Sequence, residues 1–127
     1  METKLFDSEL RLMELLWAHP QDAEPLTAKE LSLLAADRIG WNKNTTYTVI
    51  KKLVEKGAIR REEPDFRCIP LVSRSQAQRQ ETHSLLQKLF GGSKKALFSA
   101  LLEDERLTAQ DVADLRDMID RAARKSD

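Results

Sequence analysis

The segment WNKNTTYTVIKKLVEKGAIRR, residues 41–61, decides the fold, because it predicts one short helix with two different faces that ends at a glycine. Asn42 can cap the first free amides of this helix, and Gly57 can supply the left-handed residue that ends it. Four side chains at helical spacing form a face suited to a protein core. They are Thr46, Ile50, Leu53 and Val54. We therefore expect this helix to pack on one side against the rest of a domain.

The opposite face of the helix carries short hydrogen-bonding groups and cations instead of the Glu/Lys alternation of a solvated helix. Its members are Asn44, Thr45, Thr48, Lys51 and Lys52. A solvated amphipathic helix is the plainer interpretation of such a pattern. The polar face, the basic residues that follow and the spacing from the preceding helix together favour a surface that binds DNA.

Each polar residue of this helix has an expected role on DNA. The candidate readers of base edges are Asn44, Thr45 and Thr48, because Asn can pair with adenine and the Thr methyl can meet a thymine methyl. The candidate phosphate contacts are Lys43, Lys51 and Lys52, since lysine is a flexible point charge. Asn42 and Tyr47 complete the candidate DNA-binding set, and Tyr47 fits packing as well as phosphate contact.

Two helices and a hairpin are predicted around this helix. A first helix runs from about Asp7 to about His19, and a second begins with a capping box of Thr27 and Glu30 and ends near Gly40. The short connection that follows is typical of a helix-turn-helix. After residue 57 the apolar pattern alternates, with turn residues at 63–65, which predicts a small hairpin. The cations of this hairpin, or wing, are Arg60, Arg61 and Arg67.

A change in composition at Ser73 separates this predicted winged-helix DNA-binding domain, residues 1–72, from a helical dimerisation domain, residues 73–127. Three helices are expected there, over about 76–90, 93–103 and from Thr108 onward. Their apolar candidates for the dimer interface are Leu85, Leu86, Leu89, Phe90, Leu97, Leu101, Val112, Leu115 and Ile119. Helices of this size cannot bury such faces alone, so we expect two copies to interleave as a homodimer. The fold class is mainly α with a small β-hairpin.

Composition limits the other functions. Among the 127 residues, 21 Lys and Arg balance 21 Asp and Glu, but basic residues gather in residues 38–61 and acidic ones toward the C-terminus. One cysteine, Cys68, with two histidines cannot supply a closed zinc site. No catalytic constellation, metal site or cofactor site is evident, so we expect no enzyme activity.

No apolar run reaches the roughly 20 residues of a membrane span, and no signal peptide is recognisable. We expect a cytoplasmic protein that does not insert into membranes.

These motifs, in this order and spacing, resemble the penicillinase repressor family of the BlaI/MecI type. The resemblance rests on three stretches. They are EL..M..LW in the first helix (Glu9, Leu10, Met13, Leu16, Trp17), WNKNTTYT with its continuation KKLVEKGAI, and LTAQDVADL near the C-terminus. Similarity to this family implies a repressor that binds a palindromic operator as a dimer, often controlling beta-lactam-resistance genes together with a membrane sensor-protease.

Two departures from the family pattern bear on regulation. The bond that is cleaved during induction in some members corresponds to Ala100–Leu101, where the familiar members have Asn-Phe. The copper-responsive branch carries a C-terminal cysteine cluster, and this chain has none. The alternative to a repressor is a winged helix used only for protein–protein assembly, in which the polar helix face meets an acidic partner.

Overall fold

The computed structural model describes residues 4–104 and 106–126. Its elements are α1 (Asp7–Ala18), α2 (Ala28–Arg38), α3 (Lys43–Glu55), β1 (Ile59–Glu62), β2 (Arg67–Pro70), α4 (Arg74–Phe90), α5 (Lys94–Asp104) and α6 (Ala109–Ser126). The predicted fold class is confirmed: the chain is mainly helical, with one two-stranded antiparallel sheet among the described residues. Two compact units, 1–83 and 84–127, make up the structure.

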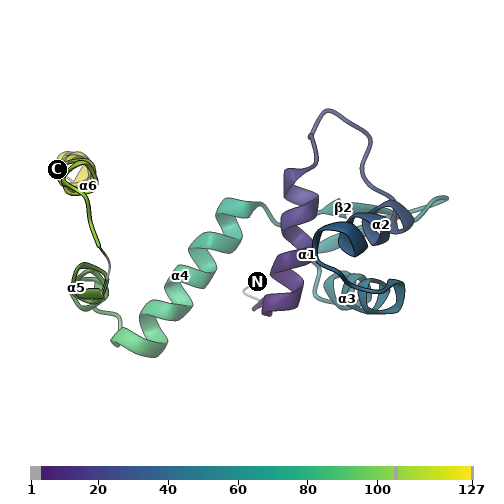
Figure 1. Ribbon diagram of the computed structural model, residues 1–127, viewed down its shortest axis with the longest axis horizontal. Coiled ribbons are helices and arrows are strands. Elements are labelled where there is room, and N and C mark those ends of the chain that lie inside the picture. The colour runs from purple at the N-terminus through teal and green to yellow at the C-terminus, as the bar shows by residue number, and fades with distance from the viewer. Residues whose placement is uncertain (1–3, 105, 127) are drawn as a thin grey trace. The chain divides into compact units, whose positions relative to one another are not determined.

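The core of the first unit lies where α1, α2 and α3 pack against one another beside the hairpin (Figure 1). Its largest fully buried apolar side chains are Leu12, Met13, Leu31, Ile50, Leu53 and Ile59. Each helix contributes residues three and four positions apart, because only that spacing keeps side chains on one face of a helix. The apolar faces of the three helices therefore meet in one core.

Local caps fix the start of α2 and the turn between α2 and α3. Thr27 and Glu30 form the predicted capping box, with Thr27 N donating to Glu30 Oε1 at 2.9 Å and Glu30 N donating to Thr27 Oγ1 at 3.1 Å. Hydrogen bonding to the backbone and side chain of Thr27 lowers the pKa of the Glu30 carboxyl. Gly40, with φ of +80°, allows the chain to leave α2. Asn42 then accepts from Thr45 N at 2.8 Å and starts α3.

The hairpin is anchored to the helices along its β2 edge. β1 and β2 pair antiparallel, with Arg61 opposite Cys68 and Glu62 opposite Arg67. On the other edge of β2, Cys68 N donates to Leu26 O and Ala28 N donates to Phe66 O, both at 2.8 Å. Phe66 belongs to the turn between the strands, where its φ is +52°. The wing is thus tied to the start of α2.

The C-terminal helices begin and end at sequence signals. α4 starts at Arg74, earlier than the predicted start at about residue 76, and ends before Gly91 and Gly92, which have φ of +54° and +84°. Thr108 and Asp111 form the predicted capping box of α6. The division between compact units falls inside α4, so the first turns of α4 belong with the winged helix. The domain boundary placed at residue 73 stays a prediction.

Candidate nucleic-acid interface

The helical period of α3 places its core residues on one side of the helix and its polar residues on the other, as predicted. Thr46, Val49, Ile50 and Leu53 are buried. On the opposite side six residues are exposed: Lys43, Asn44, Thr45, Thr48, Lys51 and Lys52. The buried threonine satisfies its hydroxyl within the helix, because Thr46 Oγ1 donates to Asn42 O at 3.3 Å. The polar face is therefore solvent-facing and backed by a rigid core.

Five of the predicted DNA-binding residues line one shallow hollow on α3. They are Lys43, Asn44, Tyr47, Thr48 and Lys51. Thr45 and Lys52 are exposed but lie outside this hollow. Lys43 Nζ lies 5.8 Å from the centroid of the Tyr47 ring, and Tyr47 is half-buried against the core. Tyr47 thus both packs on the core and forms a wall of the hollow.

The hydrogen bond of Thr48 limits what this side chain can offer a ligand. Thr48 Oγ1 donates to Asn44 O at 2.9 Å. With its proton committed to the backbone, the hydroxyl can only accept, and the methyl group is its other available part. A threonine in this state can accept a bond from an amino group or contact a methyl group. Asn42 is similarly committed, since its side-chain oxygen caps the helix.

The cations of α3 are unneutralised. Among the described residues, Lys43, Lys51 and Lys52 have no carboxylate within ion-pair distance. Lys56, the C-cap of α3, differs, because its Nζ pairs with Glu9 Oε1 at 2.5 Å and donates to Lys4 O at 2.9 Å. Its side chain is 21% exposed and that of Glu9 is 1% exposed. Lys56 therefore stabilises the fold, and the three other lysines define the basic surface.

The wing carries its own counter-charges. Arg60 donates to Glu62 at 2.8 Å, and Arg61 donates to Glu63 and lies 4.0 Å from the centroid of the Phe66 ring. Both arginines remain on the exposed part of the hairpin. Because each has an adjacent carboxylate, the wing adds little net positive charge to the surface of α3.

Arg67, the third predicted wing cation, points back into the domain. Its Nη1 donates to Pro25 O at 2.8 Å, and its Nη2 lies 3.1 Å from Glu24 Oε2. The side chain is 28% exposed. Arg67 thus fastens the α1–α2 loop to β2, and the structure does not bring it together with the α3 residues. Sequence reasoning missed this role because Pro25 and Arg67 are 42 residues apart.

The predicted dimer residues form apolar surfaces on the C-terminal helices. Leu85, Leu89, Leu101, Val112 and Ile119 are exposed, Phe90, Leu97 and Leu115 are half-buried, and Leu86 is buried. Exposure reaches 69% for Leu89 and 57% for Ile119. Among the described residues, α4, α5 and α6 make few contacts with one another. Ala100 and Leu101 lie inside α5.

Other chemistries find little support in the described part of the chain. No group of three His, Cys, Asp or Glu side chains there is placed to hold a metal ion. Cys68 is buried, and burial raises the pKa of its thiol to about 11. The thiol is therefore protonated at neutral pH and is a poor nucleophile. None of the described helices is long and apolar enough to span a bilayer.

Comparison with known proteins decides the family. The family model for the penicillinase repressor matches residues 5–121, nearly the whole chain. The chain belongs to the penicillinase repressor family. The resemblance seen in the sequence motifs is therefore confirmed, and membership places this penicillinase repressor homologue among DNA-binding transcriptional repressors. It is also similar to an uncharacterized 16.5 kDa protein in the ptsI 3' region of Latilactobacillus sakei, with 26% identity over 114 residues, covering 88% of this chain and 75% of that protein.

Proposed function

We propose that this protein represses transcription by binding a palindromic operator as a homodimer, with one α3 in the major groove at each half-site. The observation that carries the proposal is the surface of α3 between Lys43 and Lys52. It is exposed, rich in hydrogen-bonding groups, and has three lysines without a carboxylate partner among the described residues. A solvated helix of a nearly neutral protein has no physical need for such a surface. A DNA duplex offers phosphates to the lysines and base edges to the hydrogen-bonding groups of this surface.

The groups on α3 fit distinct parts of a duplex. Lys43, Lys51 and Lys52 would neutralise phosphates, which fixes register without reading sequence. Asn44 can pair bidentately with adenine. Thr48 would act through its acceptor lone pairs and methyl group, because its proton is held by Asn44 O. The shallow hollow between these side chains would face the base edges in the major groove.

The proposed homodimer is supported by the apolar surfaces of the C-terminal helices. Large side chains such as Leu89, Met118 and Ile119 are more than half exposed. A single chain that leaves so many apolar side chains in water gains stability when a second copy covers them. A dimer also explains operator binding, because two linked α3 surfaces bind one duplex with much higher affinity than one.

The operator experiment is a selection from random duplex DNA followed by binding assays over a salt series. We expect a palindromic consensus and affinity that falls steeply with salt. If each protomer neutralises about three phosphates, the log–log salt slope of the dimer is about −5. The alternative function, a winged helix that binds an acidic protein, predicts no retained DNA even at low salt. That result would refute the repressor proposal.

For the targets and the inducing route, support comes from the family alone. We propose that the protein acts in the cytoplasm on beta-lactam-resistance or related stress genes, with a membrane sensor-protease as a partner. Cleavage between Ala100 and Leu101 would require α5 to open, because a protease needs an extended backbone and this bond lies within a helix. The test is to look for a membrane peptidase among the flanking genes, to incubate the purified repressor with any such enzyme, and to sequence the fragments. An intact chain would contradict it.

A further inference from the structure

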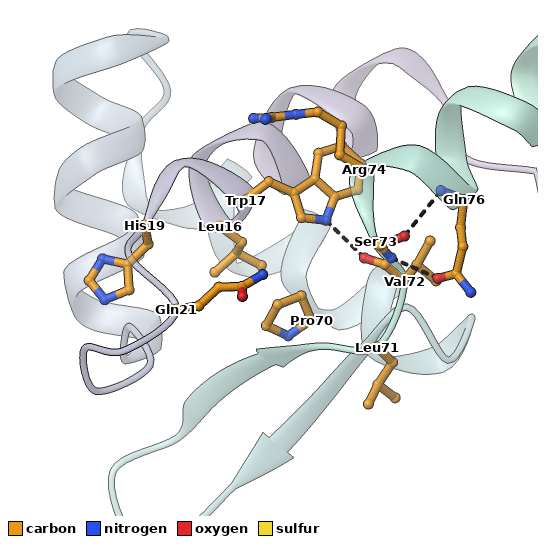
Figure 2. A pocket seen from close by; sticks show the side chains of 10 residues that line it. All are labelled: Leu16, Trp17, His19, Gln21, Pro70, Leu71, Val72, Ser73, Arg74 and Gln76. Carbon is orange, nitrogen blue, oxygen red and sulfur yellow. Dashed lines mark hydrogen bonds between the residues drawn. The ribbon is translucent and has the colours of Figure 1, made fainter.

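A group of side-chain contacts joins the end of α1 to the start of α4. Trp17 Nε1 donates to Val72 O at 2.8 Å. Arg74 Nη2 donates to Glu14 Oε2 at 3.0 Å, and its guanidinium lies 5.8 Å from the centroid of the Trp17 ring. Figure 2 shows Arg74 extended over the indole, while the indole nitrogen points to the Val72 carbonyl. We call Glu14, Trp17 and Arg74 the hinge clamp.

The hinge clamp holds the chain on both sides of Ser73, the N-cap of α4. Ser73 N donates to Gln76 Oε1 at 2.8 Å, and Gln76 N donates to Ser73 Oγ at 3.1 Å, which forms a capping box. The first turn of α4 is therefore helical from Arg74 onward. Because Val72 lies before this cap and Arg74 lies after it, two separate attachments to α1 restrict both the position and the direction of the helix.

The space behind these attachments is only partly filled. An open pocket of about 370 Å³ lies beside them, with Leu16, Trp17, Pro70, Val72 and Gln76 among its lining residues (Figure 2). Because this pocket is open to solvent, side chains do not pack across it to hold the two elements together. Ala77 is the one buried residue in the first two turns of α4. The attachment of α4 to the winged helix therefore depends strongly on the hinge clamp.

We propose that the hinge clamp fixes the direction in which α4 leaves the winged helix, and thereby sets the half-site spacing that the dimer accepts. The second part rests on the proposed function. α4 leads from each winged helix into the helices that we propose to dimerise. If the direction of α4 varies at its first turn, the distance between the two α3 surfaces of the dimer varies with it. A fixed direction makes the second binding event favourable for one spacing and unfavourable for others.

Trp17 is expected to be the dominant member of the clamp. The ion pair of Arg74 with Glu14 is solvent-exposed, with side chains 45% and 56% exposed, and such pairs contribute little alone. Trp17 is half-buried and supplies the bond to the backbone. The test therefore uses Trp17→Phe, which keeps an aromatic ring and removes the N–H donor, and the double variant Trp17→Phe/Arg74→Gln.

The first measurement needs no operator. Spin labels on Ala36→Cys in α2 and Gln78→Cys in α4, both exposed positions of the full chain, report the distance between the two helices by pulsed electron resonance. Dilution with unlabelled protein removes distances between protomers, and the buried Cys68 stays unlabelled. We expect one narrow distance distribution for the parent and one about twofold broader for the double variant, because local attachments set local order. An unchanged width would overturn the proposal.

Thr27→Ala is the matched control. It removes the N-cap of α2, which lowers stability by a similar small amount without touching the hinge. We expect its distance distribution to equal that of the parent. Equal broadening in the control and in the clamp variants would show a general effect of lower stability, and would also overturn the proposal.

The second measurement compares the selected operator with a lengthened operator. In the lengthened operator, about half a helical turn, roughly 5 base pairs, is inserted between the half-sites. The parent should bind the lengthened site about tenfold more weakly, and the double variant less than about threefold more weakly. Equal losses for both proteins would overturn the spacing part of the proposal. If the parent binds no DNA at all, the proposed function fails, while the distance measurement still decides whether the clamp fixes α4.

Discussion

Replacing Lys51 by alanine tests the division between phosphate contacts and base contacts on α3. Lys51 is exposed, lines the hollow, and has no carboxylate partner among the described residues. Its removal therefore takes one uncompensated charge from each protomer and disturbs no internal ion pair. Because a contact to phosphate carries no sequence information, Lys51→Ala should weaken binding to the operator and to random DNA by similar factors.

The size of the effect follows from counterion release. Each protomer presents three such lysines, so the proposed dimer would neutralise about six phosphates and have a log–log salt slope of about −5. Lys51→Ala leaves about four phosphate contacts per dimer, and the slope should fall to about −4. The wing is left out of this estimate because Arg60 and Arg61 already have carboxylate partners.

The assay is fluorescence anisotropy with labelled duplexes at several salt concentrations, for operator and random sequences in parallel. Lys95→Ala, which removes an exposed lysine from α5, is the control, and its slope should match that of the parent. The reasoning fails if Lys51→Ala leaves the slope unchanged. It also fails if the variant loses affinity for the operator alone, because Lys51 would then be reading sequence.

Three further predictions concern single sites. Asn44→Ala should weaken operator binding by about 1–3 kcal/mol per half-site and leave random-DNA binding nearly unchanged, as competition titrations would measure; equal losses on both would exclude base reading. Lys56→Met should lower the free energy of unfolding by about 3 kcal/mol in urea titrations, because Glu9 is buried and loses its counter-charge. A loss below about 1 kcal/mol would show that the pair is not a stabilising contact. Ile119→Glu, which places a charge on the exposed apolar face of α6, should give a folded monomer in sedimentation velocity, and an undiminished dimer would move the interface elsewhere.

Much of the fold could be predicted because its signals are local. The capping box of Thr27 and Glu30, the cap at Asn42 and the glycine after α3 each act within a few residues, and the structure contains all three. The polar residues that were expected to bind DNA share one face of α3 for the same reason, since a helical period assigns faces without reference to the rest of the protein.

The charges were less predictable than the elements. Arg67 was expected as a wing cation, but it binds Pro25 O and Glu24 of the α1–α2 loop. Arg60 and Arg61 remain exposed, yet the adjacent Glu62 and Glu63 pair with them. The type of a residue and its position in the sequence do not reveal which carboxylate an arginine pairs with. Such pairs depend on the directions of the side chains and on the course of the loops.

The sequence by itself determined the helices, the hairpin, the polar face of α3 and the family, since all of these follow from short-range spacing. Only the tertiary structure decided which cations are available for a partner. Glu9 and Lys56 are 47 residues apart, and Glu14 and Arg74 are 60 apart. The physical reason is that an ion pair or a hydrogen bond requires contact within a few ångströms, and folding alone brings distant residues that close.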